Sequence, residues 1–304
     1  MAIGEGPQIS FDTVLKSIGV SRFFSEFWSS QVLHLPDAAS QDILAEIGPL
    51  DISNLVSRSH GGTQAWLAGS GSPHASIPVN AQSAVGAFQI GATLYFVDLD
   101  AEELAVSFAN FLGVPRSKVA INLFATPQEG GTSWHFDANE NFTIQLRGTK
   151  RWWIAPNESI AFPPENHILG ATPSASLAQC SRGPLRTDPP QPSQIVDLKP
   201  GEMLYVPRGF WHCTEALTEC WSLNLCCGQL MWATVVCEAL YEQLTSIESW
   251  RGSAIGLRHG CNEHARALNR LPLLLGELAT RLEDPQKVSD LLNAIQTRDS
   301  GASL

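Results

Sequence analysis

A series of short strand-like runs between residues 93 and 225 constrains the fold of this chain more than any other feature. The runs are rich in β-branched and aromatic residues, and Gly and Pro punctuate the chain between them. Strands and helices do not alternate regularly here, which favours a β-sandwich or barrel over a doubly wound parallel sheet. The expected strands are Thr93–Leu99, Lys118–Ala125, Trp134–Leu146, Lys150–Ala155, Gln194–Leu198, Met203–Pro207, Phe210–Glu215 and Cys220–Leu225.

Helical patterns flank the β-rich middle of the chain. Short helices are expected in the first sixty residues, on both sides of a strand at Gln31–Pro36, and an amphipathic helix is expected at Ala101–Leu112. After Gly228, apolar residues recur at helical spacing. We therefore predict a domain over residues 1–228, mainly β with flanking helices, followed by a helical segment over residues 229–304.

Composition argues against several classes of protein. The formal net charge of −11 is unfavourable for a broad electrostatic contact with DNA or RNA, so no nucleic-acid partner is expected. Two uncharged stretches, Ser59–Val97 and Cys220–Cys237, carry polar residues that disfavour a membrane span, and the N-terminus has no signal-peptide pattern. The seven cysteines form no CxxC pair, which indicates reduced thiols and a cytoplasmic location.

The alternation within Trp134–Leu146 points to chemistry. The odd-numbered residues are polar, and the even-numbered ones are mostly apolar, as in a strand with one buried face. A polar face in water is the simplest interpretation. However, His135 and Asp137 stand side by side on that face, close enough to bind one cation, and the strand leads into the aromatic run at Trp152 and Trp153.

A metal would need a third ligand, and His212 is the best candidate among the eight histidines. It follows two tight turns and a short strand in the segment LKPGEMLYVPRGFWH, so it begins a new strand after a sharp corner. Two imidazoles and one carboxylate form the facial triad of non-haem Fe(II) oxygenases, which leaves open positions on the metal. The residual positive charge would suit an anionic chelating cosubstrate.

These motifs together resemble a known family. An HxD motif, a Lys thirteen residues after the Asp, and a distal His in a segment of the type G-E-x-L-Y-x-P-x-x-x-W-H are similar to the JmjC/cupin-type 2-oxoglutarate and Fe(II)-dependent oxygenases. The motifs are most similar to those of the asparaginyl hydroxylase of hypoxia-inducible factor and of the ribosomal-protein hydroxylases. The resemblance covers roughly residues 20–230. It implies a double-stranded β-helix, the jelly-roll fold of cupins, with a C-terminal helical segment.

The resemblance also implies roles for individual residues. His135, Asp137 and His212 would bind Fe(II). The cofactor-binding residues would be Lys150, which would pair with the distal carboxylate of 2-oxoglutarate, and Thr132, Asn141 and Asn224. A solvated turn lysine is the alternative for Lys150, and a hydrogen-bonded core residue is the alternative for Asn224. With O2 as the oxidant, such an enzyme hydroxylates a C–H bond and releases succinate and CO2.

Several functions remain open at this point. The first is a hydroxylase acting on an amino-acid side chain of a protein or peptide, which could be ribosomally made or carrier-bound. A methyl-lysine demethylase or small-molecule hydroxylase of the same class, and a non-enzymatic cupin that only binds, are the alternatives. The helical segment resembles a dimerisation module, which implies a homodimer, and a helical cap on one subunit is the other interpretation.

Nearby aromatic residues and two loops are candidates for substrate contacts. Trp134 and Trp211 flank the metal motifs and would hold an apolar or cationic substrate group if either faced the cavity, although core packing is the simpler interpretation. The Gly- and Ser-rich segment His60–Gln82 and the long connection Pro156–Ser193 are expected to be loops and candidate lids.

Overall fold

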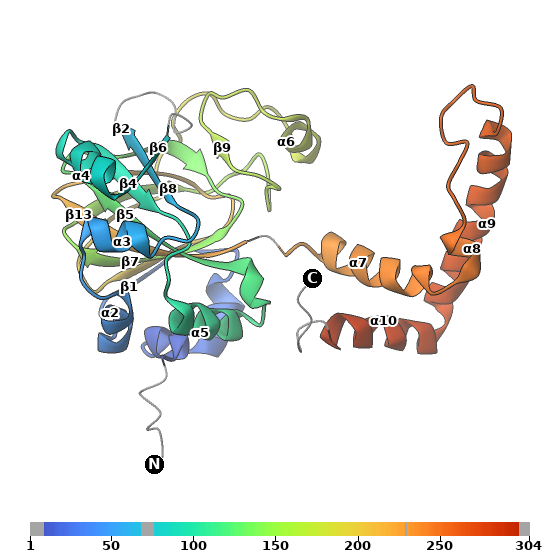
Figure 1. The fold of residues 1–304 in the computed structure, drawn as a ribbon, viewed down its shortest axis with the longest axis horizontal. Coiled ribbons are helices and arrows are strands. Elements are labelled where there is room, and N and C mark those ends of the chain that lie inside the picture. The colour runs from blue at the N-terminus through green and yellow to red at the C-terminus, as the bar shows by residue number, and fades with distance from the viewer. Residues whose placement is uncertain (1–8, 68–75, 229, 298–304) are drawn as a thin grey trace, which may run out of the picture. The chain divides into compact units, whose positions relative to one another are not determined.

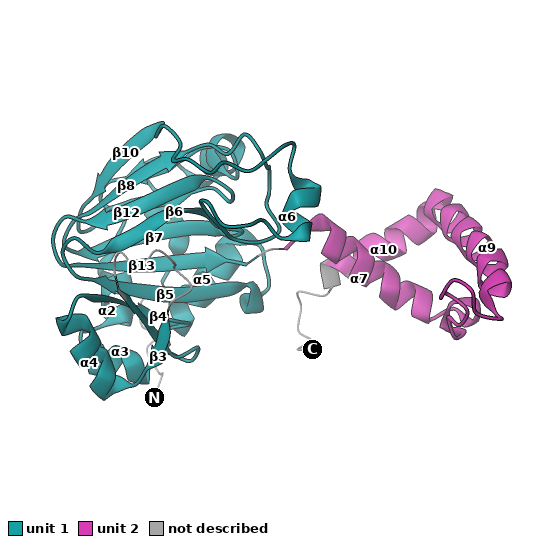
Figure 2. Cartoon of the chain, turned by 90° about the horizontal axis from the view of Figure 1, so that it is seen from above, with its two compact units in different colours: residues 1–229 teal, residues 230–304 magenta. Residues whose placement is uncertain are grey.

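The structure is a computed structural model that describes residues 9–67, 76–228 and 230–297. The chain divides into two compact units, residues 1–229 and 230–304 (Figure 2). The first unit contains both β-sheets, and the second contains only helices among its described residues (Figure 1).

An eight-stranded antiparallel sheet forms the larger layer of the first unit. Its strands run in the order β1-β11-β7-β13-β5-β4-β2-β3. From β1 to β5 the neighbours in this order are far apart in the sequence, as in a jelly roll, so this part of the sheet brings distant segments together. The strands are β1 (Leu33–Leu35), β2 (Thr63–Leu67), β3 (Ile77–Val79), β4 (Ala92–Phe96), β5 (Val119–Thr126), β7 (Glu140–Arg147), β11 (Met203–Val206) and β13 (Cys220–Cys227).

A five-stranded antiparallel sheet in the order β10-β8-β12-β6-β9 forms the smaller layer. Between the two sheets lies a small apolar cluster in which Ile154 and Leu198 of this sheet pack with Leu204 and Val206 of β11. The sheets therefore pack face to face, and the prediction of a mainly β fold is confirmed. The strands are β6 (Gly131–Phe136), β8 (Lys150–Ala155), β9 (His167–Ile168), β10 (Gln194–Leu198) and β12 (Trp211–Ala216).

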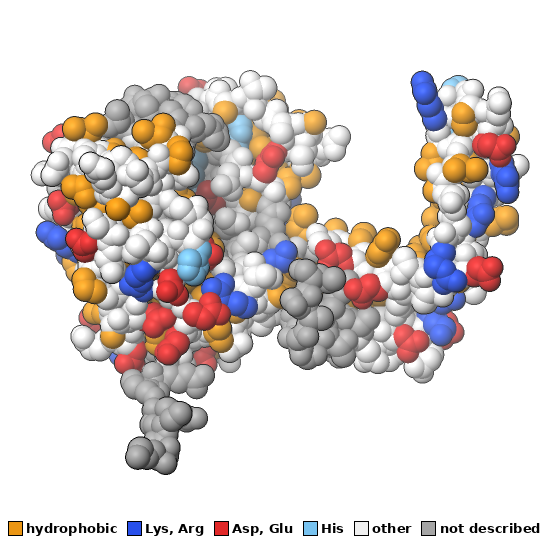
Figure 3. All heavy atoms as spheres, viewed as in Figure 1, with side chains coloured by type: hydrophobic (Ala, Val, Ile, Leu, Met, Phe, Trp, Pro, Cys, Tyr) orange, Lys and Arg blue, Asp and Glu red, His pale blue; other side chains and the backbone are white. Residues whose placement is uncertain are grey.

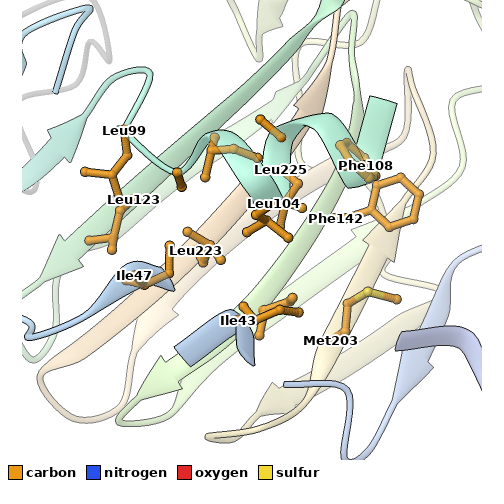
Figure 4. Close-up of a cluster of buried hydrophobic side chains, with 14 of the residues drawn as sticks. Ile43, Ile47, Leu99, Leu104, Phe108, Leu123, Phe142, Met203, Leu223 and Leu225 are labelled. Carbon is orange, nitrogen blue, oxygen red and sulfur yellow. The ribbon is translucent and has the colours of Figure 1, made fainter. Parts of the chain in front are cut away.

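The main core lies on the outer face of the eight-stranded sheet, beneath helices. Leu104 and Phe108 of α5 pack over Leu123, Leu223 and other strand residues (Figure 4). Ser40 and Asp51 begin α2 and α3 as side-chain caps, which fixes where these helices start. The helical elements of this unit are η1 (Phe11–Leu15), α1 (Val20–Arg22), η2 (Phe23–Phe27), α2 (Gln41–Ile47), α3 (Ile52–Ser57), α4 (Ala81–Gln89), α5 (Glu102–Leu112), η3 (Arg116–Lys118) and α6 (Ala175–Cys180).

The prediction of one continuous strand at Trp134–Leu146 is wrong. The segment forms β6 in the small sheet and β7 in the large one, with a bend at residues 137–139. The bend exists because its backbone bonds to other segments: the Asp137 carbonyl accepts from the Gly209 N–H, and the Ala138 N–H donates to Asn166. The alternation of faces survives on both sides, so the chain crosses between sheets with its polar residues still pointing inward.

The two expected loops contain regular structure. The segment His60–Gln82 includes β2, β3 and the start of α4, and residues 68–75 lie outside the described residues. A capping box between Asn80 and Ser83 begins α4. This helix was not expected from the sequence. The connection Pro156–Ser193 includes β9 and α6.

The second unit consists of α7 (Trp232–Thr245), α8 (Glu248–Arg251), α9 (His264–Glu283) and α10 (Pro285–Thr297). The longest of these helices, α9, buries none of its residues. No helix within the described part of the chain combines the length and the apolar character needed to cross a membrane.

Candidate metal centre

The structure brings His135, Asp137 and His212 together on the inner side of the small sheet. His135 near the end of β6 and His212 near the start of β12 are direct cross-strand neighbours, and Asp137 follows β6 at the bend. One potential ligand atom from each residue lies within 4.8 Å of the other two. The Asp137 carboxylate lies 3.9 Å from His135 Nε2 and 3.6 Å from His212 Nε2, so all three groups converge on one point.

Both imidazoles are held in the same tautomer by the backbone of their own strands. Nδ1 of His135 bonds to the carbonyl of Ser133 at 2.7 Å, and Nδ1 of His212 bonds to the carbonyl of Phe210 at 3.0 Å. A carbonyl can only accept, so Nδ1 carries the proton on each ring. In the neutral form of either ring, Nε2 then presents a lone pair to the convergence point, as a metal-binding histidine does.

A chain of polar side chains fixes the third group. The Asn141 amide donates to Asp137 Oδ2 at 2.7 Å, and its own oxygen accepts from the Cys226 thiol at 3.3 Å. The thiol in turn accepts from the Asn122 amide at 3.5 Å. This chain crosses β7, β13 and β5, so the eight-stranded sheet orients a carboxylate that belongs to the bend of the other sheet.

The protonation states of His135 and Asp137 favour binding of a cation between them. Burial, together with the neighbouring His212, lowers the pKa of His135 to about 4, so this ring is neutral near pH 7. Burial raises the pKa of Asp137, but the two histidines and the Asn141 amide outweigh it and hold that pKa well below its usual range. Neutral imidazoles and an ionised carboxylate form the protonation state that binds a divalent metal.

A second polar centre lies in the same cavity, around Lys150 of β8. The side chain is buried, and its Nζ reaches Thr126 Oγ1 at 3.4 Å and the ring of Phe124 at 5.5 Å. No carboxylate of the described residues pairs with it, and burial lowers its pKa. A buried ammonium without a counterion is costly, so this one is a ready partner for an anion. The alternative of a solvated turn lysine is excluded for Lys150.

The other predicted cofactor-binding residues also line this cavity. Thr132 and Thr214, on the paired strands β6 and β12, share a hydrogen bond of 2.9 Å between their hydroxyl oxygens. Asn224 of β13 lies directly across from Thr143 of β7. The Asn224 carbonyl oxygen and the Thr143 hydroxyl are buried without a hydrogen-bond partner among the described residues. Such atoms favour a bound ligand or water.

Several lining residues were missed from the sequence. The cavity is also lined by Phe124, Thr143, Thr214 and Ser222, and by Trp152, which the aromatic run indicated without assigning it to the site. Thr143, Thr214 and Ser222 are each two residues from a predicted site residue, so the strand period could have found them. Trp152 lies against His212, with ring centroids 5.7 Å apart. Trp211, by contrast, is buried in a separate apolar cluster against which Trp134 packs, so core packing is the correct interpretation of both.

Comparison with known proteins identifies relatives for part of the chain. Residues 101–234 match the family model of the JmjC domain. The uncharacterized protein YxbC of Bacillus subtilis (strain 168) is 35% identical over 136 residues, which are 44% of this chain and 41% of YxbC. The bifunctional lysine-specific demethylase and histidyl-hydroxylase NO66 of Drosophila persimilis is 37% identical over 103 residues, 33% of this chain and 12% of NO66. The chain spans less than half the length of both relatives.

A solved structure shares the fold. The ribosomal oxygenase YcfD of Escherichia coli, determined in complex with cobalt and 2-oxoglutarate, superposes with a TM-score of 0.56 at 16% identity. The superposition covers 90% of this chain and 69% of YcfD. Together with the JmjC match, it confirms the resemblance found in the motifs and the predicted jelly-roll fold of the JmjC type.

Proposed function

We propose that this chain, whose residues 101–234 match the family model of the JmjC domain, is a 2-oxoglutarate and Fe(II)-dependent oxygenase that hydroxylates a side chain of a protein or peptide. The observation that carries the proposal is the pairing of two centres in one cavity. The three convergent ligands could hold a divalent metal, and the unpaired ammonium of Lys150 could hold an anion beside it. A cupin that binds only a metal has no need for the second centre.

The residues present fit both absent groups. His135, Asp137 and His212 would hold Fe(II), since two neutral imidazoles and one carboxylate are the donor set of the facial triad. Lys150 and the hydroxyl pair of Thr132 and Thr214 would hold the distal carboxylate of 2-oxoglutarate. When bound, iron and 2-oxoglutarate activate O2 for C–H hydroxylation, with succinate and CO2 as the other products.

The protein's own contribution is position and electrostatics. The carbonyls of Ser133 and Phe210 fix the tautomer of both imidazoles, and Asn141 holds one carboxylate oxygen of Asp137. Asn224 and Thr143 offer unsatisfied polar atoms to whatever occupies the cavity. Phe124 and Trp152 add apolar surface to the lining of the same cavity.

A protein or peptide substrate is supported by the relatives, one of which is named a histidyl-hydroxylase and lysine-specific demethylase and another a ribosomal oxygenase. Hydroxylation and demethylation are separable by mass spectrometry. Incubation with a candidate peptide should add the mass of one oxygen atom. Loss of a methyl group from a methyl-lysine peptide would instead support the demethylase alternative.

The first test measures succinate release from 2-oxoglutarate by anaerobically Fe(II)-loaded protein exposed to air. Slow release without substrate is expected, and His135→Ala should abolish it. Calorimetry with 2-oxoglutarate should show binding that Lys150→Met weakens and that the exposed control Lys199→Met leaves unchanged. Absence of both release and binding would favour a non-enzymatic cupin.

The second unit supports a homodimer as the assembly. Leucines at spacings of three and four residues form a stripe along α9, and most of them are exposed (Figure 3). This spacing is the heptad pattern of helices that pack together, and an exposed stripe of this kind marks an interface. The stripe is Leu268, Leu271, Leu275, Leu278 and Leu282. Light scattering should give a dimer mass for the full chain and a monomer mass for Leu271→Glu/Leu275→Glu.

A cytoplasmic location completes the proposal. All seven cysteines are free thiols, and four of them lie on strands of the two sheets. Persistent free thiols are typical of a reducing compartment. Fractionation of cells that express the tagged chain would test this location.

A further inference from the structure

Two basic residues with no ion-pair partner lie where interior strands of the eight-stranded sheet begin or end. Arg208 lies in the turn between β11 and β12, and Lys118 immediately precedes β5. No carboxylate lies within ion-pair distance of either residue in the described part of the chain. Arg116, close by in sequence, is paired with Glu102 at 2.8 Å. In a chain with a net charge of −11, an unpaired basic pair is conspicuous.

The strand register places both residues at the same end of neighbouring strands. Val119 of β5 pairs with Cys227 of β13, and Cys227 pairs with Glu140 of β7. The backbone N–H of Arg208 donates to Glu140 Oε2 at 3.1 Å, and that of Gly228 donates to the Lys118 carbonyl at 2.7 Å. We call Arg208 and Lys118 the basic rim.

The basic rim adjoins the candidate metal centre. The N–H of Gly209, the residue after Arg208, donates to the backbone carbonyl of Asp137 at 2.9 Å. The same turn leads directly into β12, whose second residue is His212. Arg208 is thus separated by four residues along the chain from His212, so a peptide that offers a side chain to the metal centre would pass close to the rim.

The Arg208 guanidinium is prepared for a ligand that the chain does not supply. Its Nε is buried and has no hydrogen-bond partner among the described residues, and its Cζ lies 5.2 Å above the ring of Phe162. Burial lowers its pKa, although the nearby Glu140 opposes that shift. A guanidinium held on an aromatic face with free donors is the usual device for binding a carboxylate or phosphate.

Glu140 does not accept a hydrogen bond from the Arg208 guanidinium. Its two carboxylate oxygens already accept from the hydroxyls of Ser29 and Tyr205 and from the Arg208 backbone N–H. The Arg208 side chain makes no hydrogen bond to it. Glu140 therefore balances charge at a distance, and the donors of the guanidinium stay available.

We propose that the basic rim binds an anionic side chain of the substrate, close in sequence to the residue that is oxidised. This inference rests on the proposed function, because it assigns the rim to the same peptide substrate. The shared chemistry is a carboxylate or a phosphoryl group. Arg208 makes the hydrogen bonds, and Lys118 adds charge.

The test follows the 1H–15N signal of the Arg208 Nε–H in the full chain, identified as the signal lost in Arg208→Lys. The probes are capped tripeptides Ala-X-Ala with Asp, phosphoserine, Asn or Lys at the centre. The Asp or phosphoserine peptide should shift the signal saturably. A shift with phosphoserine alone assigns a phosphoryl source, and a shift with Asp assigns a carboxylate. Equal shifts with all four peptides, or none, would overturn the proposal and leave Arg208 as a structural counterion of Glu140.

Substitutions at several positions distinguish binding at the rim from effects elsewhere, so the test does not depend on one variant. Binding of the Asp peptide, followed by fluorescence anisotropy, should weaken about tenfold in Arg208→Gln and about threefold in Lys118→Gln. The exposed control Lys16→Gln should bind as the parent does. His135→Ala should lose succinate release yet keep the shift. Loss of release in the parent with the shift intact would overturn the proposed function alone, and the reverse would overturn only the rim.

Discussion

The two faces of the eight-stranded sheet differ in chemistry although they share the same strands. The outer face carries Phe142, Ile144, Leu223 and Leu225, which are fully buried under the helices. The inner face of the same strands carries Asn, Thr, Ser and Cys side chains, and among the described residues Thr143 and Asn224 there have a buried polar atom without a partner. The outer face is built as a protein core, and the inner face keeps polar groups that a core would not tolerate. Alternate residues of each strand therefore serve different purposes: those on the outer face stabilise the fold, and those on the inner face form the site.

The largest expected effect comes from removing a ligand at the inner cavity. Asp137→Ala should abolish succinate release, a loss of at least about a thousandfold, because no other carboxylate among the described residues joins the two imidazoles. The melting temperature of the metal-free protein should change little. Succinate assays and calorimetric scans of the same preparation measure both, and full turnover by the variant would contradict the ligand assignment.

A substitution on the outer face should give the opposite result. Phe142→Ala removes a fully buried ring and should lower the free energy of unfolding by about 3–5 kcal/mol. Its effect on 2-oxoglutarate binding, measured below the melting temperature, should be small. Urea unfolding monitored by circular dichroism gives the stability. A loss below about 1 kcal/mol would mean that this face tolerates cavities and that the two faces differ less than proposed.

Lys150 is the residue for which stability and binding should move in opposite directions. Lys150→Met should weaken 2-oxoglutarate binding about tenfold to a hundredfold, the value of a charge-assisted contact. Without ligand, the variant should melt at a higher temperature than the parent, because a buried ammonium without a counterion is replaced by an apolar chain. Calorimetry and thermal scans provide the comparison. A variant that both binds normally and melts lower would show that Lys150 has a structural partner instead.

The positioning of Asp137 should have a smaller effect. Asn141→Ala removes the amide that holds Asp137 Oδ2 and should weaken Co(II) binding about tenfold. Cys226→Ala, which releases the Asn141 carbonyl, should weaken it less, and Cys226→Ser should restore it. Absorption titrations with Co(II) report the affinity. If all three variants bound Co(II) as tightly as the parent protein, the bend alone would be sufficient to orient Asp137.

The smallest expected effect is a pH dependence of folding stability in the metal-free protein. The pKa of His135 is lowered to about 4 in the folded chain, so the unfolded chain binds more protons between pH 4 and about 6.5. Stability should therefore fall by about 1–2 kcal/mol as the pH drops through this window. Urea unfolding at a series of pH values tests this, and His135→Gln should flatten the curve. An unchanged slope in that variant would assign the titration to another group.

The sequence predicts the inner face well because that face depends on short-range periodicity. Strand alternation places His135, Asp137 and Asn141 on one face, whereas Lys150 is singled out only by the resemblance to the oxygenase family. The crossing of the chain from β6 to β7 could not be predicted, because it is set by bonds to Asn166 and Gly209, which are distant in sequence. For the same reason the basic rim has no local signature. Its members lie ninety residues apart and meet only through the register of three strands.

The cavity takes its polar groups from both sheets, so a molecule bound in it would contact both sheets at once. Lys150 reaches from β8 of the small sheet to Thr126 on β5 of the large one, and the Asn141 amide of β7 holds the carboxylate that follows β6. A ligand bound between these groups would link the two sheets and restrict their relative motion. Each cycle of loading and release would then stiffen and relax the whole sandwich, so that hydrogen exchange in strands far from the chemistry would report which ligand is bound.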